Sequence, residues 1–347
     1  MGVTRTGPER RSGGRVLSIA ILAIETSCDE TAVAVVEDGV RVLADSVHSQ
    51  VPDHRKYGGV VPEVASRRHL ETVNPLMEEA LARAGLGWPR VGAVAVTYGP
   101  GLVGALLVGV TAAKALAFAL ERPLVGVNHL EGHVYANFLV RPDLRFPLLA
   151  LVVSGGHTDL VLMAGHGRFA LVGGTRDDAA GEAFDKVARL FDLGYPGGPA
   201  IEKAGAGIDP GAVSLPRAYL EPGSLDFSFS GLKTAAARLK QRGLSPGVIA
   251  AAFQRAVVDV LVDKTMTAAG RYGVGTVLLA GGVAANGLLR SGLADRAEAA
   301  GLSFGCPPRR LCTDNAAMIG CAAYYRFLRG DFAGLDLNAV PGLALGD

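Results

Sequence analysis

The sequence predicts a duplicated α/β protein whose two halves begin with the same arrangement of strands. The segment ILAIETSCDET (21–31) aligns with LLALVVSGGHT (148–158), and each is followed by two further strand-like segments. A strand, a glycine turn and a helix then recur in the same order in both halves, which argues against a chance match. With 49% apolar residues over 347 positions, the chain can bury two cores. Four aligned positions are identical: Leu22/Leu149, Ala23/Ala150, Ser27/Ser154 and Thr31/Thr158.

The first half is predicted to start with a core strand in LSIAILAI (17–24), which we therefore do not interpret as a signal peptide. Two more strands follow, in TAVAVVEDG (31–39) and RVLADS (41–46). VGAVAVTYGPG (91–101) is predicted as a strand and a glycine turn that lead into an apolar helix. The half ends with RPLVGVNHLEGHVYAN (122–137), a strand, a loop and a helix start.

The second half repeats this order, with strands in TDLVLMAGH (158–166) and RFALVGG (168–174) after the aligned segment. GTVLLAGGVAAN (275–286) precedes a helix, and GLSFGCPPRRLCTDNAAMIG (301–320) gives the last strand, loop and helix start. Ligands of such sheets bind where strand ends meet glycine turns, so we expect the active site in a cleft between the lobes. The predicted domains are an extension (1–17), a first lobe (18–146), a second lobe (147–331) with an insertion around 175–245, and a tail (332–347).

The net charge of +1 excludes a global field that would draw the protein to nucleic acid or membranes. Local basic segments remain, in HRKY (54–57), SRRH (66–69) and PPRR (307–310), although each could equally be a solvated charged face. No uninterrupted apolar run reaches the roughly 18 residues of a membrane helix. Four cysteines without a CxxC pair predict structural thiols in a reducing cytoplasm: Cys28, Cys306, Cys312 and Cys321.

A metal site is predicted around NHLEGH (128–133), because His129 and His133 lie one helical turn apart and can face one ion. Asp314, at a comparable position of the second half, is the expected third ligand. Two histidines and one carboxylate leave open positions and suit Fe(II) or Zn(II). The alternatives are that the histidines only pack or cap a helix, and that Asp314 is a helix N-cap.

A metallopeptidase is not favoured by this segment, although HLEGH resembles HExxH. The glutamate of HExxH follows the first histidine directly, whereas Glu131 comes two residues after His129. It therefore lies about 200° around the helix from that histidine. We expect Glu131 to face away from a bound metal.

Ten motifs lie between about residues 19 and 331: IETSCDET, YGGVVPEVASRRH, GPGLVGALLVG, NHLEGH, LVVSGGHT, DDAAGEAFDK, YPGGP, DFSFSGLKT, AGGVAAN and CTDNAAMIG. Together they resemble the TsaD family of tRNA threonylcarbamoyladenosine synthesis proteins. The resemblance implies the two-lobed fold of actin, Hsp70 and sugar kinases. It also implies an acyltransferase that moves a threonylcarbamoyl group from its adenylate to the exocyclic amine of the adenosine beside the anticodon, in tRNAs that read codons beginning with adenine.

The resemblance further implies that the metal at His129, His133 and Asp314 is iron, with zinc as the alternative. The implied partners are tRNA, threonylcarbamoyl-AMP, a TsaB-like paralogue that pairs with the first lobe, and a small TsaE-like ATPase. The competing hypotheses are a small-molecule kinase or ATPase of the same fold and a scaffold without activity. Phosphoryl transfer uses oxygen-bound Mg²⁺, so a transition metal at the two histidines would distinguish the transferase from the kinase.

The adenylate is expected to bind at the glycine turns of the second half. Backbone amides of the VVSGG turn would hold phosphate, two carboxylates would accept ribose hydroxyls, and an amide side chain would lie beside the nucleoside. A hairpin turn, solvated charges and an N-cap are the simpler explanations of the same residues. In the first half, Glu25 or Asp29 could take the proton of the attacking amine or only order the loop. In the second half, His157 could contact substrate or cap its hairpin. The expected substrate-binding residues are Val152, Val153, Ser154, Gly155, Gly156, Asp185, Gly198, Glu202 and Asn286.

Overall fold

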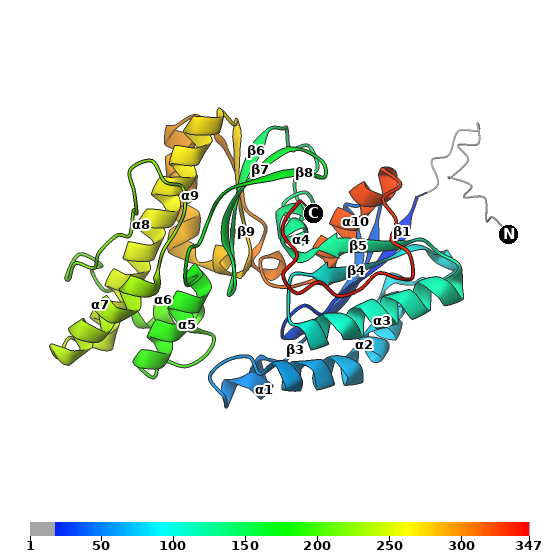
Figure 1. The fold of residues 1–347 in the computed structure, drawn as a ribbon, viewed down its shortest axis with the longest axis horizontal. Coiled ribbons are helices and arrows are strands. Elements are labelled where there is room, and N and C mark those ends of the chain that lie inside the picture. The colour runs from blue at the N-terminus through cyan, green and yellow to red at the C-terminus, as the bar shows by residue number, and fades with distance from the viewer. Residues whose placement is uncertain (1–17, 347) are drawn as a thin grey trace.

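The computed structural model describes residues 18–346, so the predicted extension (1–17) lies outside the described residues. Two five-stranded sheets stand side by side, each covered by helices, with one short and one longer helix between them (Figure 1). Both sheets are mixed, with antiparallel and parallel neighbours. The predicted α/β class and the two-lobed arrangement are confirmed.

The first sheet has the strand order β3-β2-β1-β4-β5. Its central strand, β1, pairs antiparallel with β2 and parallel with β4, so that Ile24 lies opposite Val33 on one side and Val96 on the other. All six residues of β1 are buried, as expected for a strand covered on both faces. The strands are β1 (Ala20–Glu25), β2 (Glu30–Glu37), β3 (Arg41–Ser49), β4 (Val91–Gly99) and β5 (Leu124–Asn128).

The second sheet repeats this topology in the order β10-β9-β6-β7-β8. Its central strand, β6, pairs antiparallel with β7 and parallel with β9, and Leu151 lies opposite Leu160 and Leu279. Strand order and direction therefore match those of the first sheet strand for strand, which confirms the duplication. The strands are β6 (Leu148–Val153), β7 (Thr158–Gly165), β8 (Arg168–Gly174), β9 (Thr276–Ala280) and β10 (Ser303–Gly305).

Helix α3 covers the first sheet and follows the glycine turn after β4. Among residues 18–346 it alone is long and apolar enough to cross a membrane by length and composition. Lys114 interrupts it and donates a hydrogen bond to the carbonyl of Leu337, 3.0 Å away. The helix packs on β4 and α2, while Leu107 and Phe118 stay exposed. The helices of the first lobe before β5 are α1 (Val51–Arg55), α2 (Pro62–Ala84) and α3 (Val103–Leu120).

The second lobe carries three helices within the predicted insertion around 175–245, and two longer helices after it. The long helix α8 is central to this lobe and packs against α6, α7 and α9 (Figure 1). Its N-cap, Ser245, accepts a hydrogen bond from the amide of Val248. The helices are α5 (Ala180–Leu190), α6 (Gly197–Ala204), α7 (Ser230–Gln241), α8 (Pro246–Tyr272) and α9 (Gly287–Ala299).

Helices α4 (His129–Tyr135) and α10 (Ala316–Leu328) pack against each other between the two sheets. Gly132 allows this close approach, because a Cβ atom there would lie 2.6 Å from Cδ1 of Ile319. Although α10 follows the second sheet in the chain, it packs on β1 and β2 of the first. The segment after α10 also returns to the first lobe, where Val340 N donates to Tyr98 O at 2.7 Å.

Candidate metal centre and substrate site

The two histidines are presented by a helix that starts at the end of a parallel strand. β5 ends at Asn128, and the Asn128 side chain caps α4 by accepting from the amides of Leu130 (2.9 Å) and Glu131 (3.4 Å). The Asn128 amide group in turn donates to the carbonyl of Ala344, 2.9 Å away. The cap fixes the start of the helix, so the directions of His129 and His133 are set by the sheet.

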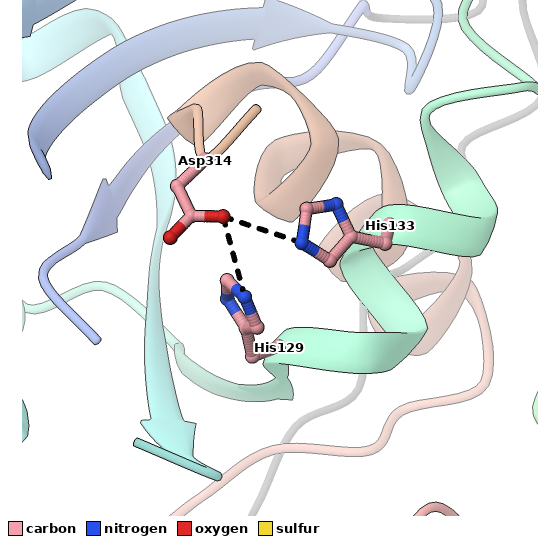
Figure 2. Close-up of side chains that lie close together, drawn as sticks. All are labelled: His129, His133 and Asp314. Atoms are coloured by element: carbon pink, nitrogen blue, oxygen red, sulfur yellow. Dashed lines mark ion pairs between the residues drawn. The ribbon is translucent and has the colours of Figure 1, made fainter. Parts of the chain in front are cut away.

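His129, His133 and Asp314 come together as predicted, and Figure 2 shows all three side chains pointing toward one another. Oδ1 of Asp314 lies 3.4 Å from Nε2 of His129 and 3.3 Å from Nε2 of His133. Three potential ligand atoms thus lie within 4.8 Å of one another, and no other such group of His, Cys, Asp or Glu side chains occurs in residues 18–346. This donor set suits a transition metal.

Asp314 does not cap the helix that follows it. The N-cap of α10 is Asn315, whose side chain accepts from the amide of Met318 at 2.9 Å. The alternative that Asp314 is the N-cap is therefore wrong, because the next residue has that role. The Asp314 carboxylate points instead toward the two imidazoles (Figure 2).

Glu25, the last residue of β1, contacts Nδ1 of His129, on the side of the ring opposite to Asp314. Its Oε2 is 3.1 Å from Nδ1 of His129 and accepts from the Thr97 hydroxyl at 2.5 Å, while Oε1 accepts from the Ser27 amide at 2.5 Å. The Ser27 hydroxyl is also 3.2 Å from Nδ1 of His129. A carboxylate only accepts, so Glu25 favours a proton on Nδ1 and leaves the lone pair of Nε2 toward Asp314.

The electrostatics of the cluster show which charges it holds. Burial raises the pKa of Asp314, but the two imidazoles outweigh burial and hold that pKa far below its usual range. Burial lowers the pKa of His129, yet Asp314 and Glu25 together raise it well above its usual value. Burial and the charge of His129 lower the pKa of His133. The carboxylates of Asp314 and Glu25 thus favour a positive charge between them.

His133 is buried, and neither of its ring nitrogens has a hydrogen-bond partner in the described part of the chain. Buried polar atoms rarely stay unsatisfied without a reason. Nε2 faces Asp314 at 3.3 Å, outside good hydrogen-bond geometry, and this is the position from which it could bind an ion. The residues present therefore fit a metal ion.

Glu131 faces away from the cluster, as expected from its position on the helix. Its Oε2 accepts from Nε (2.9 Å) and Nη2 (2.7 Å) of Arg326 in α10. The side chain is almost fully buried. Its carboxylate is thus committed to a buried ion pair and does not resemble the glutamate of a metallopeptidase.

The predicted phosphate turn is open at its glycines. Gly155 and Gly156 make no backbone hydrogen bond among residues 18–346, and a Cβ atom at either would meet nothing within 4 Å. Two free amides next to empty space are typical of an anion-binding turn. The first two residues of the motif differ, since Val152 and Val153 are buried in β6 and pair with β7. Ser154 N donates to His157 O at 2.9 Å, which closes the turn.

The predicted ribose carboxylates each anchor a neighbouring loop through one oxygen. Asp185 Oδ1 accepts from the amide of Gly197 at 2.6 Å, and Glu202 Oε1 accepts from the amide of Gly287 at 3.0 Å. The second oxygen of each side chain has no hydrogen bond within the described residues. Gly198, next to the first anchored amide, has open space where a Cβ would be.

Asn286 serves as the N-cap of α9, which is the simpler of its two explanations. Its Oδ1 accepts from the amide of Leu289 at 3.0 Å, and its Nδ2 donates to Oε1 of Gln254 at 3.2 Å. The side chain is 7% exposed. The cap holds the glycine turn of AGGVAAN beside Glu202, so a contact with the nucleoside stays a prediction.

The turn after β1 faces the second lobe. Burial raises the pKa of Asp185, and the charge of Asp29 adds to this, so the two carboxylates are neighbours across the lobes. Burial also raises the pKa of Glu30 to about 9, assisted by Asp314 and Asp29. His157 has a pKa of about 4, lowered by burial and then by the histidines of the cluster. His157 thus lies near the metal ligands, Asp29 lies near Asp185, and Glu30 is an acidic group that the sequence did not single out.

The fold defines the general class of this protein. It is similar to the fold of full-length HypF in a phosphate- and nucleotide-bound form (TM-score 0.63, 13% identity, 91% of this chain and 47% of that one). It is also similar to component A of (R)-2-hydroxyglutaryl-CoA dehydratase from Acidaminococcus fermentans (TM-score 0.54, 17% identity, 89% and 98%). At these identities the likeness concerns the two-lobed fold alone.

The chain belongs to the TsaD family of tRNA N6-adenosine threonylcarbamoyltransferases, whose profile matches residues 41–321. It is 62% identical over 331 residues to the enzyme of that name from Symbiobacterium thermophilum, covering 94% of this chain and 97% of the relative. It is 59% identical to the one from Moorella thermoacetica over the same shares. The reaction is therefore transfer of a threonylcarbamoyl group to the N6 amine of a tRNA adenosine, and the kinase hypothesis is not supported.

Proposed function

We propose that this transferase depends on a metal ion, iron or zinc, held by His129, His133 and Asp314. The single observation that carries the proposal is the convergence of three ligand atoms within 4.8 Å around a histidine whose nitrogens lack partners. When bound there, the ion would supply positive charge to polarise the acyl carbonyl or offset the leaving phosphate. Asp314 and Glu25 raise the pKa of His129 because their negative charges favour a positive charge at this place, which a bound ion would also supply.

The chain's own side chains and amides have separate tasks in this proposal. The free amides of Gly155 and Gly156 would bind the phosphate of threonylcarbamoyl-AMP. The unused oxygens of Asp185 and Glu202 would accept its ribose hydroxyls. Glu25 would orient His129, because both of its oxygens are already occupied by hydrogen bonds and it has no access to the amine.

The test is a transfer assay on purified protein with threonylcarbamoyl-adenylate and unmodified tRNA, read by mass spectrometry of the nucleosides, together with elemental analysis. The wild type should carry about one iron or zinc ion per chain. His133→Ala should lose the metal and the product together. His48→Ala is the matched control, because His48 is an exposed histidine of β3. A His133→Ala protein with full metal content and full activity would contradict the proposal.

We also propose that a TsaB-like paralogue covers the outer face of the first lobe and that a TsaE-like ATPase assists turnover. The first proposal is supported by apolar side chains on two neighbouring helices that are 43% or more exposed, whereas most apolar residues are buried. They are Leu70 of α2 and Val103, Leu107 and Phe118 of α3. The tRNA substrate and four free cysteines agree with the cytoplasm as the proposed location.

A further inference from the structure

One basic segment found in the sequence, HRKY (54–57), forms a firmly anchored tip at the end of the first lobe. Gln50 N donates to the carbonyl of Asp29 at 2.9 Å, which ties the start of the segment to the turn beside the metal cluster. Gln50 and His54 are fully buried. Asp53 accepts from Nε (2.9 Å) and Nη2 (3.1 Å) of Arg68 in α2. The tip is therefore anchored both to the turn after β1 and to α2.

The tip meets the second lobe at Arg189. This arginine lies near the end of α5, whose start is bound to the phosphate turn, where Gly181 N donates to Ser154 O at 3.2 Å. The Arg189 guanidinium donates to the carbonyl of Gly58, and a Cβ atom at Gly59 would lie 3.1 Å from its Nη2. In Figure 1, α1 and the loop after it lie beside α5 at the junction of the lobes. The tip thus lies where a segment bound to the turn after β1 meets a helix bound to the predicted phosphate turn.

The exposed side chains of the tip are two cations and one aromatic ring. Arg55, Lys56 and Tyr57 are exposed, and Tyr57 is 53% exposed. Neither cation has an ion-pair partner in residues 18–346, and Lys56 Nζ lies 5.0 Å from the centre of the Tyr57 ring. Because the net charge of the chain is only +1, these unpaired cations beside an exposed ring form a local basic site and are not part of a generally basic surface.

The neighbouring basic segment, SRRH (66–69), shows the contrast. Arg67 pairs with Glu63 at 2.6 Å, and Arg68 pairs with Glu71 as well as with Asp53. His69 is buried and bound to the hydroxyl of Thr31. This segment is occupied by the protein's own groups and supports the tip, whereas Arg55 and Lys56 remain free for an external anion.

We propose that Arg55, Lys56 and Tyr57 bind the tRNA substrate next to the reacting adenosine. That adenosine must reach the site between the lobes while its neighbours remain outside, at the edge where the tip stands. RNA loops are recognised through cations on phosphates and aromatic rings stacked on unpaired bases, which are the groups the tip presents. Arg55 and Lys56 contact two phosphates, and Tyr57 stacks on a base of the anticodon loop.

The test compares tRNA binding by the wild type, the double variant Arg55→Gln with Lys56→Gln, and Tyr57→Ala, each as the full chain. Unmodified tRNA is titrated at several salt concentrations between 50 and 200 mM, a range over which phosphate contacts are strongly weakened. Loss of two phosphate contacts should make the slope of log affinity against log salt shallower by about 1.5. Tyr57→Ala should bind about 10- to 100-fold more weakly, and Tyr57→Phe should bind like the wild type.

The matched control removes two other exposed arginines, in Arg90→Gln with Arg122→Gln. Both precede the amino ends of strands, β4 and β5, at the sheet edge opposite to the site. This control should keep the wild-type slope. The Michaelis constant for threonylcarbamoyl-adenylate should be unchanged in every tip variant. A double variant whose affinity and salt slope equal those of the control, or whose adenylate constant rises while tRNA binding stays intact, would overturn the proposal.

Discussion

The carboxylate of Glu25 lies 3.1 Å from Nδ1 of His129, while Nε2 of the same ring faces Asp314 at 3.4 Å. One carboxylate is thus bound to each nitrogen of one imidazole, and the first is completely buried. Metal-binding histidines commonly donate their second N–H to a carboxylate in this way, which fixes the tautomer and the ring orientation. The end of β1 is therefore part of the candidate metal centre although it contributes no ligand.

Glu25→Gln should weaken metal retention about 10- to 100-fold, because the amide can also present its N–H to Nδ1 and so lose the preferred tautomer. Dialysis against a chelator of graded strength, followed by elemental analysis, measures the effect. Thr97→Val, which removes one donor to the same carboxylate, should have a smaller effect in the same direction. Equal metal retention in Glu25→Gln and the wild type would show that the carboxylate does not position His129.

Asp314→Asn should lose metal and transfer activity while melting near the wild-type temperature. The reason is that the cap of α10 belongs to Asn315 and is untouched by this change. Asn315→Ala is the reciprocal variant: it should cost about 0.5–2 kcal/mol of stability and keep the metal. Thermal melts and metal analysis of both proteins check the pair. If the two variants exchanged these phenotypes, the assignment of ligand and cap would be reversed.

Arg326→Met should destabilise the fold by about 3–5 kcal/mol, because it leaves the carboxylate of Glu131 buried without its partner. Burial already raises the pKa of Glu131, and Arg326 opposes this effect more than Arg329 does. Adding Glu131→Gln to the same protein should recover part of the loss, since no charge is then buried. Urea denaturation of both variants measures the difference, and a double variant no more stable than Arg326→Met would refute this account.

Asp159 should make stability depend on pH. Burial raises its pKa from an ordinary value of 3.8 to about 6, so the folded state holds this proton more tightly than the unfolded state. The linked stability is therefore fully present below about pH 4 and is lost as the pH rises toward about 6. Asp159→Asn should remove this decline and melt a few degrees higher than the wild type at pH 7. The exposed Asp143→Asn is the control, and an unchanged pH profile in Asp159→Asn would contradict the prediction.

Much of the fold was predictable because the repeat carries the positions that a sheet must bury. The alignment of Leu22 with Leu149 and of Ala23 with Ala150 places two central strands correctly, and both strands have the same neighbours in the structure. The position of α10 was not predictable in this way. It depends on contact between residues far apart in the chain, such as Gly132 with Ile319, and no local pattern records such a contact.

The site shows the same division between local and distant information. Helical spacing placed His129 and His133 on one face, and comparison of the halves indicated Asp314. The place of Glu25 behind His129 could not be inferred, since it requires the carboxyl ends of β1 and β5 to meet with β4 between them. Asp314 and Asn315 are adjacent and both are common caps, so only the backbone geometry distinguishes them.

The packing of α10 and of the segment after it has a consequence for synthesis on the ribosome. Core positions of the first sheet, such as Ile21 and Ala23, are covered by a helix that begins at Ala316. The cap of the histidine helix is completed by the carbonyl of Ala344. The first lobe is therefore translated first but finished last, and its apolar face must wait for the second lobe to emerge. A nascent chain of this protein would expose that face to chaperones for most of its translation, whatever the stability of the mature fold.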